Sequence, residues 1–63
     1  MTGRQRSYIW RLARKAMTRR QLTMAELKER AREELGVDID EDMSREDASK
    51  VIEWLKELAG EED

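Results

Sequence analysis

The residues in this sequence that could do chemistry are a group of cations with an aromatic ring among them. The first twenty positions hold seven Lys or Arg residues and no acid: Arg4, Arg6, Arg11, Arg14, Lys15, Arg19 and Arg20. Trp10 has an arginine four positions away on either side. Guanidinium and ammonium groups neutralise phosphates, and an indole ring stacks on a base or packs on a sugar. The pattern therefore predicts a nucleic-acid-binding surface that includes Trp10.

The same residues also have a structural interpretation. Trp is usually largely buried, which favours placing Trp10 at the edge of the core. The arginines could pair with acids elsewhere in the chain, although exposed ion pairs add too little stability to explain so segregated a pattern. Both interpretations are consistent with the sequence.

Charge is segregated along the chain. Residues 1–32 carry ten Lys or Arg and two acids, a net charge of +8, whereas residues 33–63 carry three Lys or Arg and thirteen acids, a net charge of −10. The acidic half could dock on a basic protein surface, even one that normally holds nucleic acid. Because the two halves are complementary between copies as well as within one, a homodimer or a self-associating structural protein is a further alternative.

Catalytic and metal-binding chemistry is not indicated. The chain has no His and no Cys, so its serines lack their usual activating base and the usual zinc ligands are missing. Asp38, Asp40 and Asp42 resemble the start of an EF-hand loop, but Met43 and Ser49 stand where that loop needs Gly and Glu. We therefore expect no enzyme activity, no small-molecule substrate, no cofactor and no specific metal site.

Three amphipathic helices are expected to position these residues. Each begins at a Ser or Thr with a Gln, Glu or Asp three residues later, which is the pattern of a capping box. The capping pairs are Thr2 with Gln5, Thr23 with Glu26, and Ser44 with Asp47, and Gly36 and Gly60 end the second and third helices. The chain has no Pro and only three Gly, which favours an all-helical domain. The predicted helices cover about 3–17, 24–35 and 45–59. Residues 18–22 are expected to form a short connection, although without Gly or Pro there the first helix could continue for a further turn.

Apolar residues recur every three or four positions in each predicted helix, which gives one buried face per helix. The expected core is Ile9, Leu12, Ala13, Ala16 and Met17; Met24, Leu27, Ala31 and Leu35; and Ala48, Val51, Ile52, Leu55, Leu58 and Ala59. Trp54 should lie at the edge of this core, and Val37, Ile39 and Met43 of the acidic connector should fold back onto it. We predict one all-α domain over residues 1–63, a compact three-helix domain with the third helix packed across the first two and a frayed acidic tail at 61–63.

Size and apolar patterning bound the remaining possibilities. A chain of 63 residues supports one domain with only a few kcal/mol of net stability. Its apolar runs are too short for a membrane span or for the core of a secretory signal. We expect a cytoplasmic protein that does not associate with membranes.

A family resemblance adds to this interpretation. Gln5, Ile9, Trp10 and Leu12, followed after a middle helix and a glycine by the run Ala-Ser-Lys-Val-Ile-Glu-Trp-Leu-Lys at 48–56, resemble the C-terminal helical part of the GemA family of regulatory proteins of Mu-like phages. The likeness covers roughly residues 5–58. Similar helices occur in small domains of phage recombination proteins that act on single-stranded DNA. The resemblance implies a phage or mobile-element setting and a role around host DNA transactions, and it supplies no catalytic residues.

The sequence therefore predicts a non-enzymatic accessory protein that binds nucleic acid through its basic first helix. Sequence specificity should be low, because the chain has no Asn and only two Gln for reading adenine. The alternatives are a protein-interaction module that docks on a host enzyme of DNA or RNA metabolism through its acidic face, and a self-associating structural protein.

Overall fold

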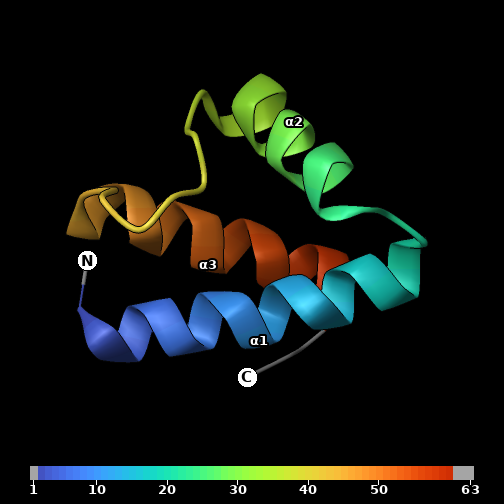
Figure 1. The fold of residues 1–63 in the computed structure, drawn as a ribbon, viewed down its shortest axis with the longest axis horizontal. Helices are drawn as coiled ribbons and strands as arrows, with labels where there is room; N and C mark the ends of the chain where they lie inside the picture. The colour runs from blue at the N-terminus through green and yellow to red at the C-terminus, as the bar shows by residue number, and fades with distance from the viewer. Residues whose placement is uncertain (1, 61–63) are drawn as a thin grey trace.

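The computed structural model describes residues 2–60, and these form three helices and no strand (Figure 1). Helix α1 spans Gly3–Arg20, α2 spans Met24–Leu35 and α3 spans Arg45–Ala59. The predicted all-α, three-helix fold is confirmed, and so are the bounds of the second and third helices. The predicted acidic tail at 61–63 lies outside the described residues. Within the described part, no helix is both long enough and apolar enough to cross a membrane.

Helix α1 is longer than predicted. Its expected end was at about residue 17, with a further turn as the alternative, and the helix does continue through the expected connection to Arg20. The reason is that 18–20 contain no helix breaker and that Arg19 and Arg20 place positive charge at the negative end of the helix dipole. The chain leaves the helix at Gln21, a residue with a left-handed φ of 55° whose N–H donates to the Met17 carbonyl.

All three helices begin where predicted, and in α1 and α2 both hydrogen bonds of the predicted capping box are formed. In α1 the Thr2 hydroxyl accepts from the N–H of Gln5 at 3.1 Å, and the Gln5 side chain accepts from the N–H of Thr2 at 3.1 Å. Thr23 and Glu26 make the same reciprocal pair at the start of α2. In α3 the Ser44 hydroxyl accepts from the N–H three residues on at 3.1 Å, but the return bond is not formed. The Asp at that position is one methylene shorter than the Glu that completes a capping box.

Helices α1 and α3 lie side by side and run in the same direction (Figure 1). At their N-terminal ends Gln5 Nε2 donates to the Arg45 carbonyl at 3.4 Å. At their C-terminal ends Arg20 Nε donates to the Leu58 carbonyl at 3.3 Å. The expectation that the third helix would cross the first two is therefore wrong. Their two long apolar stripes bury the most surface when aligned, whereas α2 contributes only two fully buried residues and packs less extensively on both.

The core is built from all three helices and the connector. Its buried apolar residues are Ile9, Leu12, Ala13 and Ala16 of α1; Leu27 and Ala31 of α2; Val37, Ile39 and Met43 of the connector; and Ala48, Val51, Trp54, Leu55 and Ala59 of α3. Five residues predicted for the core are half-buried at its margin instead: Met17, Met24, Leu35, Ile52 and Leu58. The predicted fold-back of the connector is confirmed.

Trp54 is more deeply buried than the sequence suggested. It was expected at the edge of the core but is only 8% exposed. Its Nε1 donates to Glu34 Oε2 of α2 at 3.1 Å. A buried indole needs such an acceptor, because an unpaired N–H is costly away from water. The acceptor comes from another helix, so the spacing of residues in α3 alone could not predict this burial.

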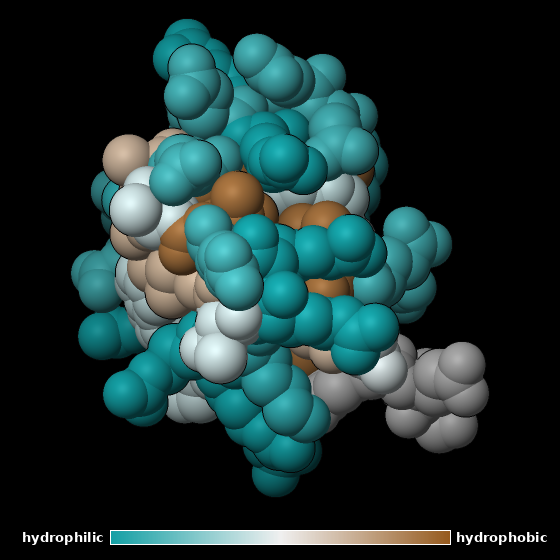
Figure 2. Space-filling model, turned by 90° about the vertical axis from the view of Figure 1, so that its right-hand side faces the viewer, coloured by the Kyte–Doolittle hydropathy of each residue, from teal (hydrophilic) through white to brown (hydrophobic). Residues whose placement is uncertain are grey.

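Figure 2 shows the end of the molecule where α1 and α3 finish. Hydrophilic side chains cover most of this face, with small apolar areas between them. No large apolar side chain is fully exposed on residues 2–60, and no polar or charged residue there is buried.

Candidate nucleic-acid interface

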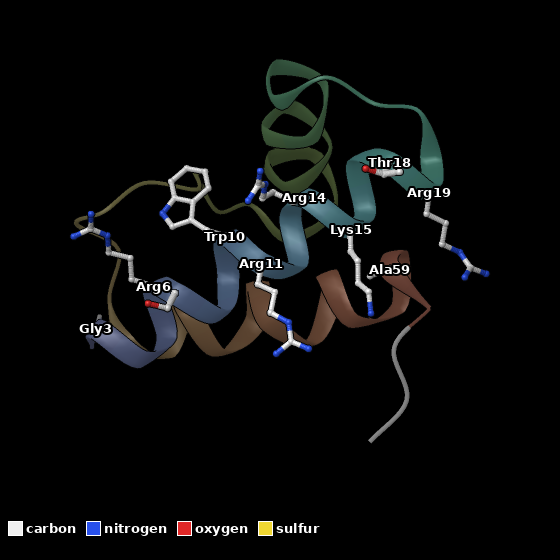
Figure 3. A pocket seen from close by; sticks show the side chains of 10 residues that line it. Gly3, Arg6, Trp10, Arg11, Arg14, Lys15, Thr18, Arg19 and Ala59 are labelled. Atoms are coloured by element: carbon white, nitrogen blue, oxygen red, sulfur yellow. The ribbon is translucent and has the colours of Figure 1, made fainter.

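An open, shallow groove runs along the exposed face of α1 (Figure 3). Nine of its lining residues come from α1 and one from α3: Gly3, Arg6, Ser7, Trp10, Arg11, Arg14, Lys15, Thr18, Arg19 and Ala59. We call this the basic groove, and Arg6, Arg11, Arg14, Lys15 and Arg19 the groove cations. Spacings of three and four residues, between Arg11, Arg14, Lys15 and Arg19, place these cations on neighbouring rows of one helix. The basic groove has a volume of about 1090 Å³.

Six of the eight predicted site residues line the basic groove, namely the five groove cations and Trp10. The seventh, Arg4, lines a smaller adjoining hollow that shares Ser7 and Arg11 with the basic groove. The eighth, Arg20, lines neither and instead reaches the end of α3. The structure thus brings most of the predicted residues to one surface and separates Arg20 from them.

Trp10 lies in the basic groove and does not pack into the core. Seven half-buried apolar residues pack against the buried core, and Trp10 is not one of them. Its ring is half-buried, and in Figure 3 the ring and Arg14 point to the same side of α1, while Arg11 and Lys15 point to the other. The structural interpretation that favoured the edge of the core for Trp10 does not describe this position.

Arg6 forms an ion pair with an acid of another element. Its guanidinium Nη2 lies 3.4 Å from Glu41 Oε1 of the connector, and the two side chains are 56% and 62% exposed. An ion pair as exposed as this contributes only about 0–1 kcal/mol. A phosphate can therefore replace Glu41 at little cost, so pairing does not remove Arg6 from the site.

The other cations differ in how they are engaged. Arg14 is exposed, and its side chain makes no hydrogen bond or ion pair within residues 2–60. Arg11 and Lys15 each already have an interaction within the protein, so a ligand must compete for them. An accessible positive charge of the basic groove therefore lies four residues from Trp10.

Arg19 and Arg20 lie at the C-terminal ends of both long helices. Gly60 ends α3 with a left-handed φ of 69°, and the Arg19 guanidinium lies where a Cβ of residue 60 would be. Arg20 donates to the Leu58 carbonyl. Because α1 and α3 are parallel, their negative dipole ends are neighbours, and these two arginines offset both. Arg20 therefore has a structural role at the end of α3.

Replacing Arg20 by Ala is expected to lower the free energy of unfolding by about 1 kcal/mol, because one charge-assisted bond and one favourable dipole contact are lost. Urea denaturation followed by circular dichroism measures this change. Arg14→Ala is the matched control, because an exposed cation without a partner should change stability by less than about 0.5 kcal/mol. Equal stability of the two variants would contradict the structural role of Arg20.

The acidic connector between α2 and α3 contains one hydrogen bond of its own and one ion pair to α2. Asp40 Oδ1 accepts from the Asp42 N–H at 2.8 Å, which is an Asx-type turn. Asp38 Oδ1 lies 3.6 Å from Arg32 Nε of α2. Among residues 2–60, no three His, Cys, Asp or Glu side chains lie close enough to hold a metal ion.

The sequence analysis did not identify Ser7, Thr18 or Ala59 as site residues. Ser7 and Thr18 place hydroxyl groups in the basic groove, and such groups donate to phosphate oxygens. They lie four and seven residues from Arg11 and Arg14, so the sequence alone could have placed them on the same side of the helix. Ala59 comes from α3, and only the parallel packing of the two helices brings it there.

Comparison with known proteins gives no family for this chain. No protein-family model, no curated protein and no solved structure matches it. The resemblance to GemA-like proteins stays a prediction, and the function is argued from the chemistry of the basic groove.

Proposed function

We propose that this protein is a non-enzymatic nucleic-acid-binding protein that holds phosphates on the exposed face of α1. The observation that supports this proposal is the composition of the basic groove, which has five cations, two hydroxyl side chains and one indole ring but no acidic residue among its lining residues. Clustered positive charge of this kind attracts a polyanion and raises its local concentration.

The cations of α1 lack acidic neighbours on their own helix. The first acid in the chain is Glu26, so no cation of α1 has an i,i+4 partner of opposite charge. The first turn of α1 contains no acid either, so Arg4 and Arg6 stand at the positive end of the helix dipole. This arrangement opposes helix stability locally and increases the attraction for phosphate.

Sequence specificity of the basic groove is low in this proposal. Its lining contains no Asn or Gln side chain for reading adenine and no Asp or Glu for reading cytosine. Arg, Lys, Ser and Thr contacts to phosphate fix the position of the ligand but carry no sequence information. The family resemblance supports placing this binding among phage or mobile-element DNA transactions in the cytoplasm.

The test is the affinity for labelled oligonucleotides, measured by fluorescence anisotropy at about 50 mM salt. Arg14→Glu is expected to weaken binding about tenfold, because a hydrogen bond to a charged group is worth about 1.5 kcal/mol. Arg30→Glu is the matched control. It changes the net charge of the protein equally, but Arg30 is an exposed residue of α2 and lines no part of the basic groove.

Two results would contradict the proposal. Equal weakening by both variants would mean that binding follows net charge and not the basic groove. Failure of the unmodified protein to bind any oligonucleotide at this salt concentration would remove nucleic acid as the ligand. The function to pursue would then be docking of the acidic half on a protein partner.

A further inference from the structure

The two tryptophans of this protein are used in different ways. Trp54 is 8% exposed and its N–H is hydrogen-bonded to Glu34. Trp10 is half-buried and lines the basic groove, and its side chain makes no hydrogen bond within residues 2–60. An indole ring left accessible among cations is a stacking platform for a nucleic-acid base. One ring is therefore part of the fold, while the other remains accessible to a ligand.

Trp10 lies midway along a row of α1 that has an arginine at either end. Arg6 and Arg14 are each four residues away, which is about 6 Å along the helix axis. The two arginines are therefore about 12 Å apart along the axis. Nucleotides in a stacked strand rise about 3.4 Å each, so this distance spans three to four of them. A base on the ring thus has phosphates within reach of both guanidinium groups.

We infer that the ligand of the basic groove is a single-stranded nucleic acid, with one base stacked on the Trp10 ring and the flanking phosphates on Arg6 and Arg14. This inference rests on the proposed function and names the substrate class of the same site. Stacking requires a free base face. In a duplex both faces of each base are covered by neighbouring base pairs, so a duplex would leave the ring with only sugar and phosphate to contact.

The length of the basic groove limits the size of the site. From Arg6 to Arg19 the helix axis rises about 20 Å. At about 3.4 Å per stacked nucleotide this length holds about six nucleotides, and a more extended strand would place fewer. Affinity should therefore rise with oligonucleotide length up to about six nucleotides and then change little.

The experiment uses the whole protein and three probes: a single-stranded oligothymidine of eight nucleotides, a duplex of the same length, which carries about twice the charge per unit length, and inorganic polyphosphate. Trp10→Leu is expected to weaken single-strand binding about 5- to 150-fold, because stacking on an aromatic side chain is lost. Polyphosphate has no bases, so its affinity should be unchanged. Trp10→Phe retains an aromatic face and should restore most of the single-strand affinity.

Intrinsic fluorescence gives an independent measurement. The single strand should quench the fluorescence of the unmodified protein, whereas the buried Trp54 that remains in the Trp10→Leu variant should not respond. Circular dichroism checks that each variant is folded, which is expected because Trp10 does not pack against the core.

The outcomes separate this inference from the proposed function. Duplex binding as tight as single-strand binding, with no quenching, would overturn the inference and leave phosphate binding in place. An equal loss of polyphosphate affinity in Trp10→Leu would also overturn it, because the ring would then only shape the surface. Binding of none of the three probes would instead contradict the proposed function itself.

Discussion

The Leu12→Ala variant is expected to be largely unfolded at 25 °C. Leu12 is fully buried at 0% exposure, on the face of α1 that forms the core. Truncating a buried Leu to Ala costs about 2–5 kcal/mol, the lost transfer energy plus the energy of the cavity. A single core in a domain of this size supplies about 3–5 kcal/mol in total. The helical circular dichroism signal and its thermal transition measure the effect.

Met17→Ala is the control for this prediction, because Met17 lies on the same helix but is only half-buried. It should cost about 1 kcal/mol, less than a fully buried residue. In a domain of this size 1 kcal/mol shifts the thermal midpoint by about 4–8 °C. A Leu12→Ala midpoint within that range of the unmodified protein would contradict the central place of Leu12 in the core.

Helix bounds and most of the core could be predicted because they depend on local patterns. A Thr with Gln or Glu three residues later marks a helix start, and Gly36 and Gly60 mark two helix ends. The end of α1 was predicted too early, because Gln21 and not a glycine takes the left-handed conformation there. A left-handed non-glycine residue carries no clear local signal.

The parallel packing of α1 and α3 could not be predicted in the same way. It depends on contacts between residues far apart in the sequence, such as Gln5 with Arg45 and Arg20 with Leu58. The different roles of the two tryptophans have the same origin, because the burial of Trp54 depends on Glu34 of another helix. Local periodicity identifies an apolar or basic face but not the element that covers it.

The candidate site shows the same division. The cations of the basic groove share one helix, so their closeness along α1 follows from their positions in the sequence. The pairing of Arg6 with Glu41 and the position of Arg20 at the end of α3 are tertiary features, and the sequence did not separate these two residues from the other cations. The segregation of charge along the sequence therefore indicated a positively charged surface on α1. The partners of individual cations, such as Arg6 and Arg20, are seen only in the structure.

Parallel packing also affects the electrostatics of the basic groove. The N-terminal ends of α1 and α3 are neighbours, so two positive dipole ends lie near Arg6. Glu46 and Asp47 offset the dipole of α3 in its first turn, but α1 has no acid there. At the N-terminal end of the basic groove the uncompensated dipole of α1 therefore adds to the positive charge of Arg6, while Glu41 offsets part of that charge.

Affinity for a single strand is expected to fall steeply with salt, and the slope counts the phosphates that are neutralised. Each phosphate contributes about −0.7 to the slope of log affinity against log salt for single strands. If all five groove cations contact phosphate, affinity falls about 100-fold between about 50 and 200 mM salt. If Arg11 and Lys15 keep their present partners, only three cations act and the fall is about 20-fold. Anisotropy titrations at four or more salt concentrations distinguish these two values.

Substitutions show which residues contribute to the slope of log affinity against log salt. Arg14→Glu should make the slope less negative by about 0.7, because one phosphate contact is lost. Arg30→Glu should lower affinity slightly through net charge and leave the slope unchanged, because Arg30 lies on α2 and outside the basic groove. A slope shallower than about −1 for the unmodified protein would correspond to a single phosphate contact. Such a result could not be reconciled with a strand lying along α1 from Arg6 to Arg19.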